Sequence, residues 1–217
     1  MTGLQEKLVE EIAKEFIKKY SVKNREYSIP IGVSNRHVHL TKEDLEILFG
    51  RGYKLTIKSM VNQPGQFGAN ETITIAGPKG AFHNVRILGP IRNYSQVEIS
   101  RSDAYYLGLK APLRNSGELE SAEDITLIGP KGMKVLKSGL ICAKRHIHMT
   151  PEDSKAYGVK SGDYVQVETL GEKGIIFKNV LIRVSDTAAL EFHIDLDEAN
   201  CCEIKTGEKV RILGLDR

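Results

Sequence analysis

The 217-residue sequence has no tryptophan, only three cysteines and only six histidines. Cys142, Cys201 and Cys202 are odd in number and two of them are adjacent, which argues against the paired framework of small disulfide-rich secreted proteins. No apolar run approaches the ~18 residues of a membrane span, and no apolar segment near the N-terminus indicates a secretory signal. We therefore expect a cytoplasmic protein with reduced thiols that does not enter a membrane.

Charge is also modest. The formal net charge is +3, with 31 basic and 28 acidic residues, which is too small an excess to indicate nucleic-acid binding. It is compatible with a small ligand that carries phosphate. Hydrophobic residues make up 41% and charged residues 27%, as expected of a globular protein with a sizeable core.

Four of the six histidines fall in two nearly identical stretches, RHVHLTKED at 36–44 and RHIHMTPED at 145–153. In an extended strand, residues two apart point to the same face, so each His-x-His pair can direct both imidazoles at one point, as half of a zinc site does. Thr41 and Thr150 then predict helix N-caps, each with an aspartate three residues later. The doubled motif indicates an internal repeat, with a first copy beginning at 36 and a second copy at 145.

The repeat also proposes a third ligand for each pair. The two motifs are offset by 109 residues, but downstream matches such as Asn84 with Asn179 are offset by 95, which places Glu98 opposite His193. The first copy therefore carries extra residues, which we expect in a loop at 60–70. Three ligands leave one zinc position open, as in catalytic sites. The two candidate groups are His37, His39 and Glu98, and His146, His148 and His193.

Some assignments remain open at this point. Ligands from the two copies could combine in other ways, and Cys142 and Cys201 are further possible ligands, although we expect both to be buried apolar residues. Arg36 and Arg145 precede the histidine pairs and either bind an anion or form an ion pair. Arg92 has no arginine counterpart in the second copy, which makes it a candidate for binding phosphate or an oxyanion.

The hydrophobic pattern divides the chain into a helical and a β-rich part. Residues 4–20 have the spacing of an amphipathic helix, with an apolar stripe formed by Leu4, Leu8, Ile12, Phe16 and Tyr20. A polar stretch at 21–28 predicts a linker. From Ile29 onward, short β-rich runs alternate with turn sequences such as GPKG at 77–80 and 129–132, a pattern typical of barrels or sandwiches.

From Ile29 to Gly214 the sequence resembles the PduL-type phosphate propanoyltransferases, the phosphotransacylases of bacterial microcompartments. The resemblance rests on IPIGVSNRHVHLT, NQPGQFG, GPIRNYSQVEISRSDA and EFHIDLDEAN. It implies a mainly β fold of two pseudo-symmetric barrels capped by short helices, one built from residues 26–35 and 144–217 and the other from 36–143. Residues 1–25 would form the N-terminal amphipathic helix and its linker.

The resemblance further implies two zinc ions per chain, one held by each candidate group, and a phosphate contact from Arg92. Arg86, Leu88 and Asn200 match positions that contact coenzyme A. The implied reaction converts a short-chain acyl-CoA, propanoyl-CoA or acetyl-CoA, and phosphate into acyl phosphate and coenzyme A. Residues 1–20 would bind shell or core proteins in a microcompartment lumen; the alternative is a helix packed on the protein's own barrels, as a lid or dimer contact. A homodimer is a further option.

Two other functions fit parts of the pattern. A binuclear zinc hydrolase also uses His-x-His, but such barrels need about 250 residues of alternating strands and helices. A non-catalytic metal-binding barrel is the second alternative, which the open coordination positions and Arg92 disfavour.

Overall fold

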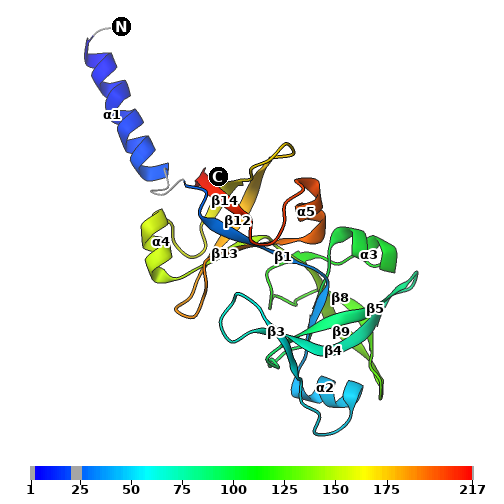
Figure 1. Ribbon diagram of the computed structural model, residues 1–217. Coiled ribbons are helices and arrows are strands. Elements are labelled where there is room, and N and C mark those ends of the chain that lie inside the picture. Colours follow the sequence, from blue (N-terminus) through cyan, green and yellow to red (C-terminus); the bar gives the residue numbers. More distant parts are fainter. Residues whose placement is uncertain (1–2, 21–25, 217) are drawn as a thin grey trace.

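In the computed structural model, which describes residues 3–20 and 26–216, strands dominate and the helices are short apart from the first (Figure 1). The helices are α1 (Gly3–Tyr20), α2 (Lys42–Phe49), α3 (Arg101–Leu107), α4 (Pro151–Tyr157) and α5 (Leu196–Cys201). The strands are β1 (Ile29–Ser34), β2 (His37–His39), β3 (Ile57–Met60), β4 (Phe67–Ala76), β5 (Ala81–Gly89), β6 (Gln96–Glu98), β7 (Leu113–Arg114), β8 (Glu123–Ile128), β9 (Met133–Ala143), β10 (His146–Met149), β11 (Tyr164–Glu168), β12 (Ile176–Val184), β13 (Glu191–Asp195) and β14 (Lys209–Leu215).

One barrel, here called the split barrel, combines β1 with the five strands of the C-terminal part of the chain. Its strand order is β1-β13-β10-β12-β11-β14, and β1 closes it by pairing in parallel with β13 and antiparallel with β14. Its core is aliphatic and aromatic, with Phe192, Ile29 and Ile31 fully buried. The chain therefore enters this barrel with one strand, leaves it, and returns for the rest.

The segment between β1 and β10 forms the second barrel, here called the central barrel. Its strands close in the order β4-β5-β2-β6-β9-β8, because β8 pairs with both β9 and β4. The short strands β3 and β7 extend it at β4 and β9. The expected mainly β architecture of two barrels with short helices is confirmed, and we propose residues 26–35 with 144–217 and residues 36–143 as its two domains.

Each His-x-His strand leads directly into a capped helix, as the repeat predicts. Thr41 caps the N-terminus of α2 and accepts a hydrogen bond from the backbone N–H of Asp44, while Thr150 caps α4 and accepts one from the backbone N–H of Asp153. The aspartate of α4 also accepts from the backbone N–H of Thr150, which completes a capping box. These caps fix the point where each strand stops, and with it the direction of the two preceding histidines.

The arginines that precede the histidines form ion pairs at equivalent places in the two barrels. Arg36 donates to Asp103 in α3 at 2.7 and 3.0 Å, and Arg145 lies 3.1 Å from Glu198 in α5. Each guanidinium also lies over a phenylalanine ring. Of the two roles left open by the sequence, the ion pair is the one these arginines take.

The extra residues of the first copy are not simply a loop. Met60 ends β3 and Phe67 begins β4, so only 61–66 connects the strands of the segment that we expected to be irregular. The pairing of β3 with β4 makes this insertion a short hairpin. Its tip carries Gln63, which reaches the split barrel, as described below.

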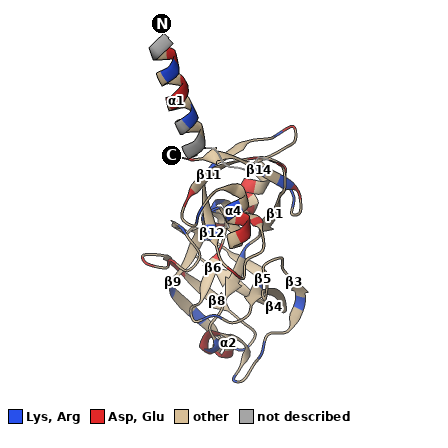
Figure 2. Ribbon diagram, turned by 90° about the vertical axis from the view of Figure 1, so that its left-hand side faces the viewer, with Lys and Arg blue, Asp and Glu red and all other residues tan. Residues whose placement is uncertain are grey.

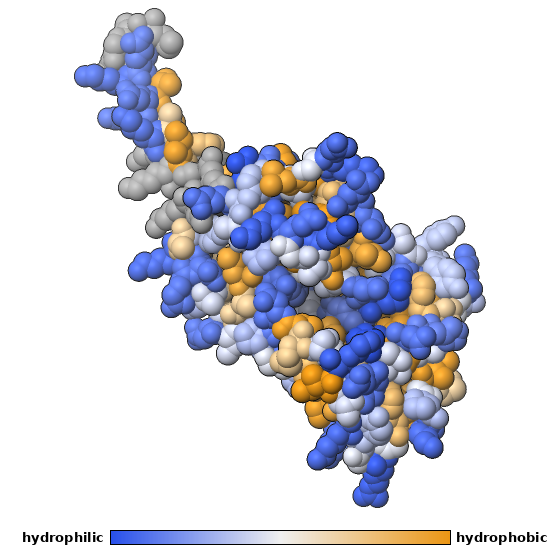
Figure 3. Space-filling model, in the orientation of Figure 1, coloured by the Kyte–Doolittle hydropathy of each residue, from blue (hydrophilic) through white to orange (hydrophobic). Residues whose placement is uncertain are grey.

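The N-terminal helix lies outside both barrels (Figure 1) and carries charges of both signs (Figure 2). Figure 3 shows apolar side chains along one side of it, where Leu8, Ile12 and Phe16 expose 57%, 58% and 55% of their surface. The side chains of Leu4 and Tyr20 and the expected linker at 21–25 lie outside the described residues. The predicted helix is thus confirmed, with its described apolar side chains exposed.

Within the described ranges, no helix combines the length and the apolar character that crossing a membrane requires.

Candidate metal centre

A cavity of about 650 Å³ lies between the two barrels and is lined by residues from both. Figure 3 shows the surface hollowed where the barrels meet. Both candidate metal groups line this cavity. Side chains that the sequence places more than a hundred residues apart therefore face one solvent-accessible space.

The central-barrel group consists of His37, His39 and Glu98. Strands β2 and β6 run antiparallel with His37 opposite Glu98, and His37 Nε2 lies 3.6 Å from a Glu98 carboxylate oxygen. The Nδ1 atoms of His37 and His39 lie 2.8 and 3.2 Å from the carbonyls of Asn35 and Leu88. If each Nδ1 donates its proton there, the Nε2 lone pairs are left for a metal.

The split-barrel group consists of His146, His148 and His193. His146 lies opposite His193 across β10 and β13, and the Nε2 atoms of His146 and His148 are 3.1 Å apart. The Nδ1 of His146 lies 2.8 Å from the carbonyl of Lys144, which repeats the His37 arrangement. In each of the two groups, the potential ligand atoms lie within 4.8 Å of one another.

The electrostatics of both groups favour the ligand forms of their side chains. Burial, followed by neighbouring positive groups, lowers the pKa of His146 and of His148 to about 3, and burial lowers that of His39 well below its usual value. Burial acts to raise the pKa of Glu98, but His37, a hydrogen bond from Ser116 and other neighbours hold it below its ordinary value. Neutral imidazoles and an ionised carboxylate are the species that bind Zn²⁺, so these donor sets fit zinc.

Two polar residues of this site were missed in the sequence. Glu191 is buried, and one of its carboxylate oxygens, Oε2, lies 2.6 Å from His193 Nε2 and accepts a 3.0 Å hydrogen bond from Gln63 Nε2. The Gln63 amide also bonds both backbone groups of Ala189. Gln63 lies inside the NQPGQFG motif, but its partner in the other barrel is visible only in three dimensions.

The expected substrate contacts lie in different places. Arg92, Arg86 and Leu88 line the cavity, and Arg92 donates a 3.0 Å hydrogen bond to the hydroxyl of Tyr94. Arg86 donates to the carbonyls of Ala69 and Asn70. Asn200 is exposed on α5 and is not one of the cavity-lining residues, so its role as a coenzyme A contact stays a prediction.

The cysteines do not join either histidine group in the described part of the chain. Cys142 is buried, as expected, and burial followed by the nearby Asp195 raises the pKa of its thiol to about 12. The expectation that Cys201 is buried was wrong, since it ends α5 exposed while its neighbour Cys202 packs into the core. The adjacent cysteines follow a helical turn, so they face different environments.

Comparison with known proteins finds one family. Residues 30–205 match the family model described as phosphate propanoyltransferase. Curated proteins of that name from Thermotoga maritima, Priestia megaterium and Salmonella typhimurium are 54%, 50% and 49% identical. The alignments cover 89%, 94% and 88% of this chain and 93%, 95% and 90% of those relatives.

Proposed function

Because the chain belongs to the phosphate propanoyltransferase family, we propose that it interconverts a short-chain acyl-CoA and phosphate with acyl phosphate and coenzyme A. Propanoyl-CoA is the expected substrate, with acetyl-CoA as a further one. The observation that carries the proposal is the single cavity lined by two three-donor groups and by Arg92. Such a cavity can bring a doubly charged phosphate and a thioester together.

In the proposed reaction, a phosphate oxygen attacks the thioester carbonyl carbon, the new C–O bond forms, and the C–S bond breaks to release coenzyme A as a thiolate. We propose that His37, His39 and Glu98 hold one zinc ion and that His146, His148 and His193 hold the other. When bound, zinc supplies positive charge for an anionic nucleophile and a thiophilic partner for the leaving sulfur.

Arg92 is suited to hold phosphate because its guanidinium offers a planar fork to two oxygens. The same charge can stabilise the oxyanion of the tetrahedral intermediate. Two hydrogen bonds hold Arg92 at the cavity wall. Its guanidinium donates to the hydroxyl of Tyr94, and its backbone N–H donates to the carbonyl of Leu40 at 2.8 Å. Coenzyme A would contact Arg86, Leu88 and Asn200.

We favour direct attack by phosphate over an acyl-enzyme. A cysteine nucleophile needs an accessible thiolate. Cys142 is buried with a raised pKa, and neither it nor Cys201 is among the residues that line the cavity. These features support transfer within a ternary complex.

We further propose that the enzyme works inside a bacterial microcompartment and that residues 1–20 bind shell or core proteins there. An exposed apolar stripe on a helix of this length is suited to a groove on another protein. The exposed Leu8, Ile12 and Phe16 on α1 support this role.

The test is an assay of coenzyme A release from propanoyl-CoA, with and without phosphate. Release that depends on phosphate, together with acyl phosphate as product, supports the transferase. Release without phosphate would point to a zinc hydrolase, and no release to a metal-binding barrel without catalysis.

A further inference from the structure

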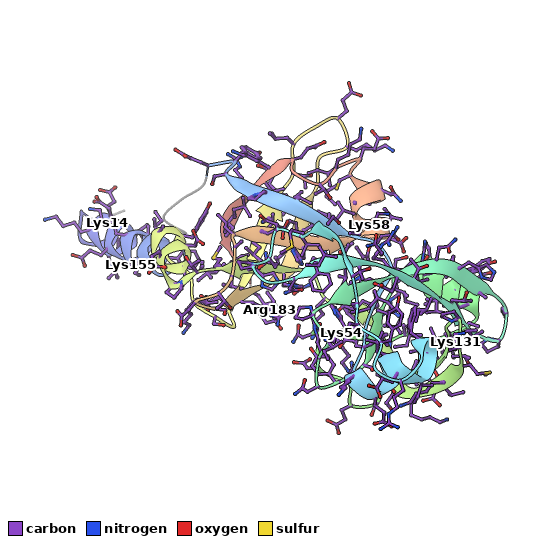
Figure 4. The ribbon with its side chains drawn as sticks, turned by 60° about the horizontal axis from the view of Figure 1, so that its bottom comes forward. Lys14, Lys54, Lys58, Lys131, Lys155 and Arg183 are labelled. Carbon is purple, nitrogen blue, oxygen red and sulfur yellow. The ribbon has the colours of Figure 1, made fainter. Side chains whose placement is uncertain are left out.

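A third arginine, Arg183, lines the cavity on the side of the split barrel. It lies on β12, which pairs in parallel with β10 so that Arg183 is directly opposite His148. Figure 4 shows it between the two barrels. Within the described residues its guanidinium has no hydrogen-bond or ion-pair partner, whereas three half-buried arginines, Arg36, Arg145 and Arg211, are each paired with a carboxylate.

The two copies of the repeat place an arginine and a leucine beside their histidines in opposite order. In the central barrel Arg86 is opposite His37, and the carbonyl of Leu88 lies within hydrogen-bonding distance of the His39 ring. At the 95-residue offset these positions become Leu181, opposite His146, and Arg183. The pseudo-symmetric barrels therefore present their arginines at different places around the cavity.

The two arginines also differ in what they already bind. One terminal nitrogen of Arg86 donates hydrogen bonds to two backbone carbonyls, at 2.7 and 3.2 Å. Among the residues that the structure describes, no group accepts a hydrogen bond from Arg183. A guanidinium that is half buried and unpaired is costly unless an anion meets it, and a fork of N–H groups is matched to a phosphoryl group.

The carboxylates that line the cavity have hydrogen-bond partners other than Arg183. Glu98 is hydrogen-bonded by Gln96 at 2.5 Å, and Glu191 by Gln63, with His193 also beside it. Asp195 caps α5 through the backbone of Glu198. No acidic side chain of the described cavity lining therefore neutralises Arg183, which leaves the substrate to do so.

We infer that Arg183 binds a phosphoryl group of a substrate, on the opposite barrel from Arg92. This inference rests on the proposed function, because it takes the phosphate-bearing ligands of that reaction as its occupants. Two sources supply the same chemistry: inorganic phosphate, which becomes the phosphoryl group of acyl phosphate, and the phosphates of coenzyme A. Arg92 and Arg183 would then hold anions from the two walls of one cavity.

The test compares Arg183→Ala and Arg183→Lys with Lys178→Ala, which removes the same charge from an exposed position on the same strand. Steady-state KM values are measured for phosphate, for propanoyl-CoA and for its 3′-dephospho form. Zinc content and unfolding temperature are recorded for each variant.

We expect Arg183→Ala to raise one KM by about 10- to 100-fold, as the loss of a charge-assisted hydrogen bond does, with zinc content retained. A higher KM for phosphate alone assigns the inorganic phosphate. A higher KM for propanoyl-CoA alone assigns coenzyme A, and its 3′-phosphate in particular if the dephospho form is insensitive to the substitution. Arg183→Lys should recover part of the loss, and Lys178→Ala should match the wild type.

Wild-type KM values in an active Arg183→Ala enzyme would overturn the inference and leave the proposed function standing. A wild-type protein without phosphate-dependent turnover would instead overturn the proposed function. Calorimetric binding of inorganic phosphate and of coenzyme A to the zinc-loaded protein tests Arg183 in either case. Equal dissociation constants for wild type and Arg183→Ala with both ligands would again overturn the inference.

Discussion

Gln63 of the central barrel donates a hydrogen bond to Glu191 of the split barrel, with 3.0 Å between Nε2 and Oε2. Both side chains are buried, and Glu191 in turn lies 2.6 Å from His193. The hairpin insertion of one barrel is thereby connected to a candidate metal ligand of the other. Because the two barrels form opposite walls of the cavity, a contact of this kind holds the walls in a fixed relative position.

Gln63→Ala should lower the free energy of unfolding by about 1–3 kcal/mol, because it leaves a buried carboxylate and the Ala189 backbone groups without their partner. Denaturant unfolding measures the change. Gln66→Ala on the same loop is the matched control and should have a much smaller effect. Equal stability of the two variants would show that the Gln63 contact contributes little.

We expect close to two zinc ions per chain by elemental analysis. The double variant His146→Ala/His148→Ala should lose one of them, because one histidine alone makes a poor zinc site. His83→Ala should keep both, since His83 is exposed and bonded to Thr74. Active enzyme without metal, or a double variant with full zinc content, would contradict the assignment.

Arg92→Ala should retain both zinc ions and lose most phosphate-dependent turnover, by about 100-fold if its fork contributes some 2.7 kcal/mol to the transition state. Arg92→Lys should restore only part of the rate, because lysine offers a point charge in place of two parallel donors. Steady-state kinetics provide the measurement. Unchanged kcat and phosphate KM in Arg92→Ala would rule out the role.

The metal-free protein should lose stability as the pH falls. His146 and His148 have a pKa of about 3 in the folded chain, against about 6.5 when unfolded. Above pH 6.5 the two imidazoles are neutral in both the folded and the unfolded chain. Between pH 6.5 and 3 they take up protons in the unfolded chain but stay neutral in the folded chain. The free energy of unfolding should therefore fall with decreasing pH, by up to about 1.4 kcal/mol per pH unit for each histidine.

Denaturant unfolding of chelator-treated protein at several pH values measures this slope. The variant His146→Ala/His148→Ala should show a shallower dependence across the same window. An identical slope in both proteins would mean that other groups control the acid sensitivity.

Deletion of residues 1–24 should leave zinc content and turnover near wild type, because the described apolar side chains of α1 are exposed and not part of either barrel core. Association with microcompartment proteins should be lost in a co-purification assay. Insolubility or inactivity of the truncated enzyme, or unchanged association, would show that the helix belongs to the fold of the enzyme itself.

The sequence by itself determined the features that depend on local pattern or on the repeat. The N-terminal helix follows from its apolar period and the caps at Thr41 and Thr150 from the residue types. The grouping of Glu98 and His193 with the two histidine pairs follows from the alignment of the two copies. These inferences succeed because strand alternation and capping chemistry act over a few residues, and because equivalent positions in a repeat occupy equivalent places.

Only the tertiary structure decided how the two barrels meet. The Gln63–Glu191 contact joins positions 128 residues apart. That Arg183 has no partner among residues 3–20 and 26–216 is recognisable only once its neighbours across β10 are known. The same holds for Cys201, which is exposed although its neighbour Cys202 is buried. Such features depend on long-range packing and on which side chains compete for a partner, and a single sequence carries no local signal for either.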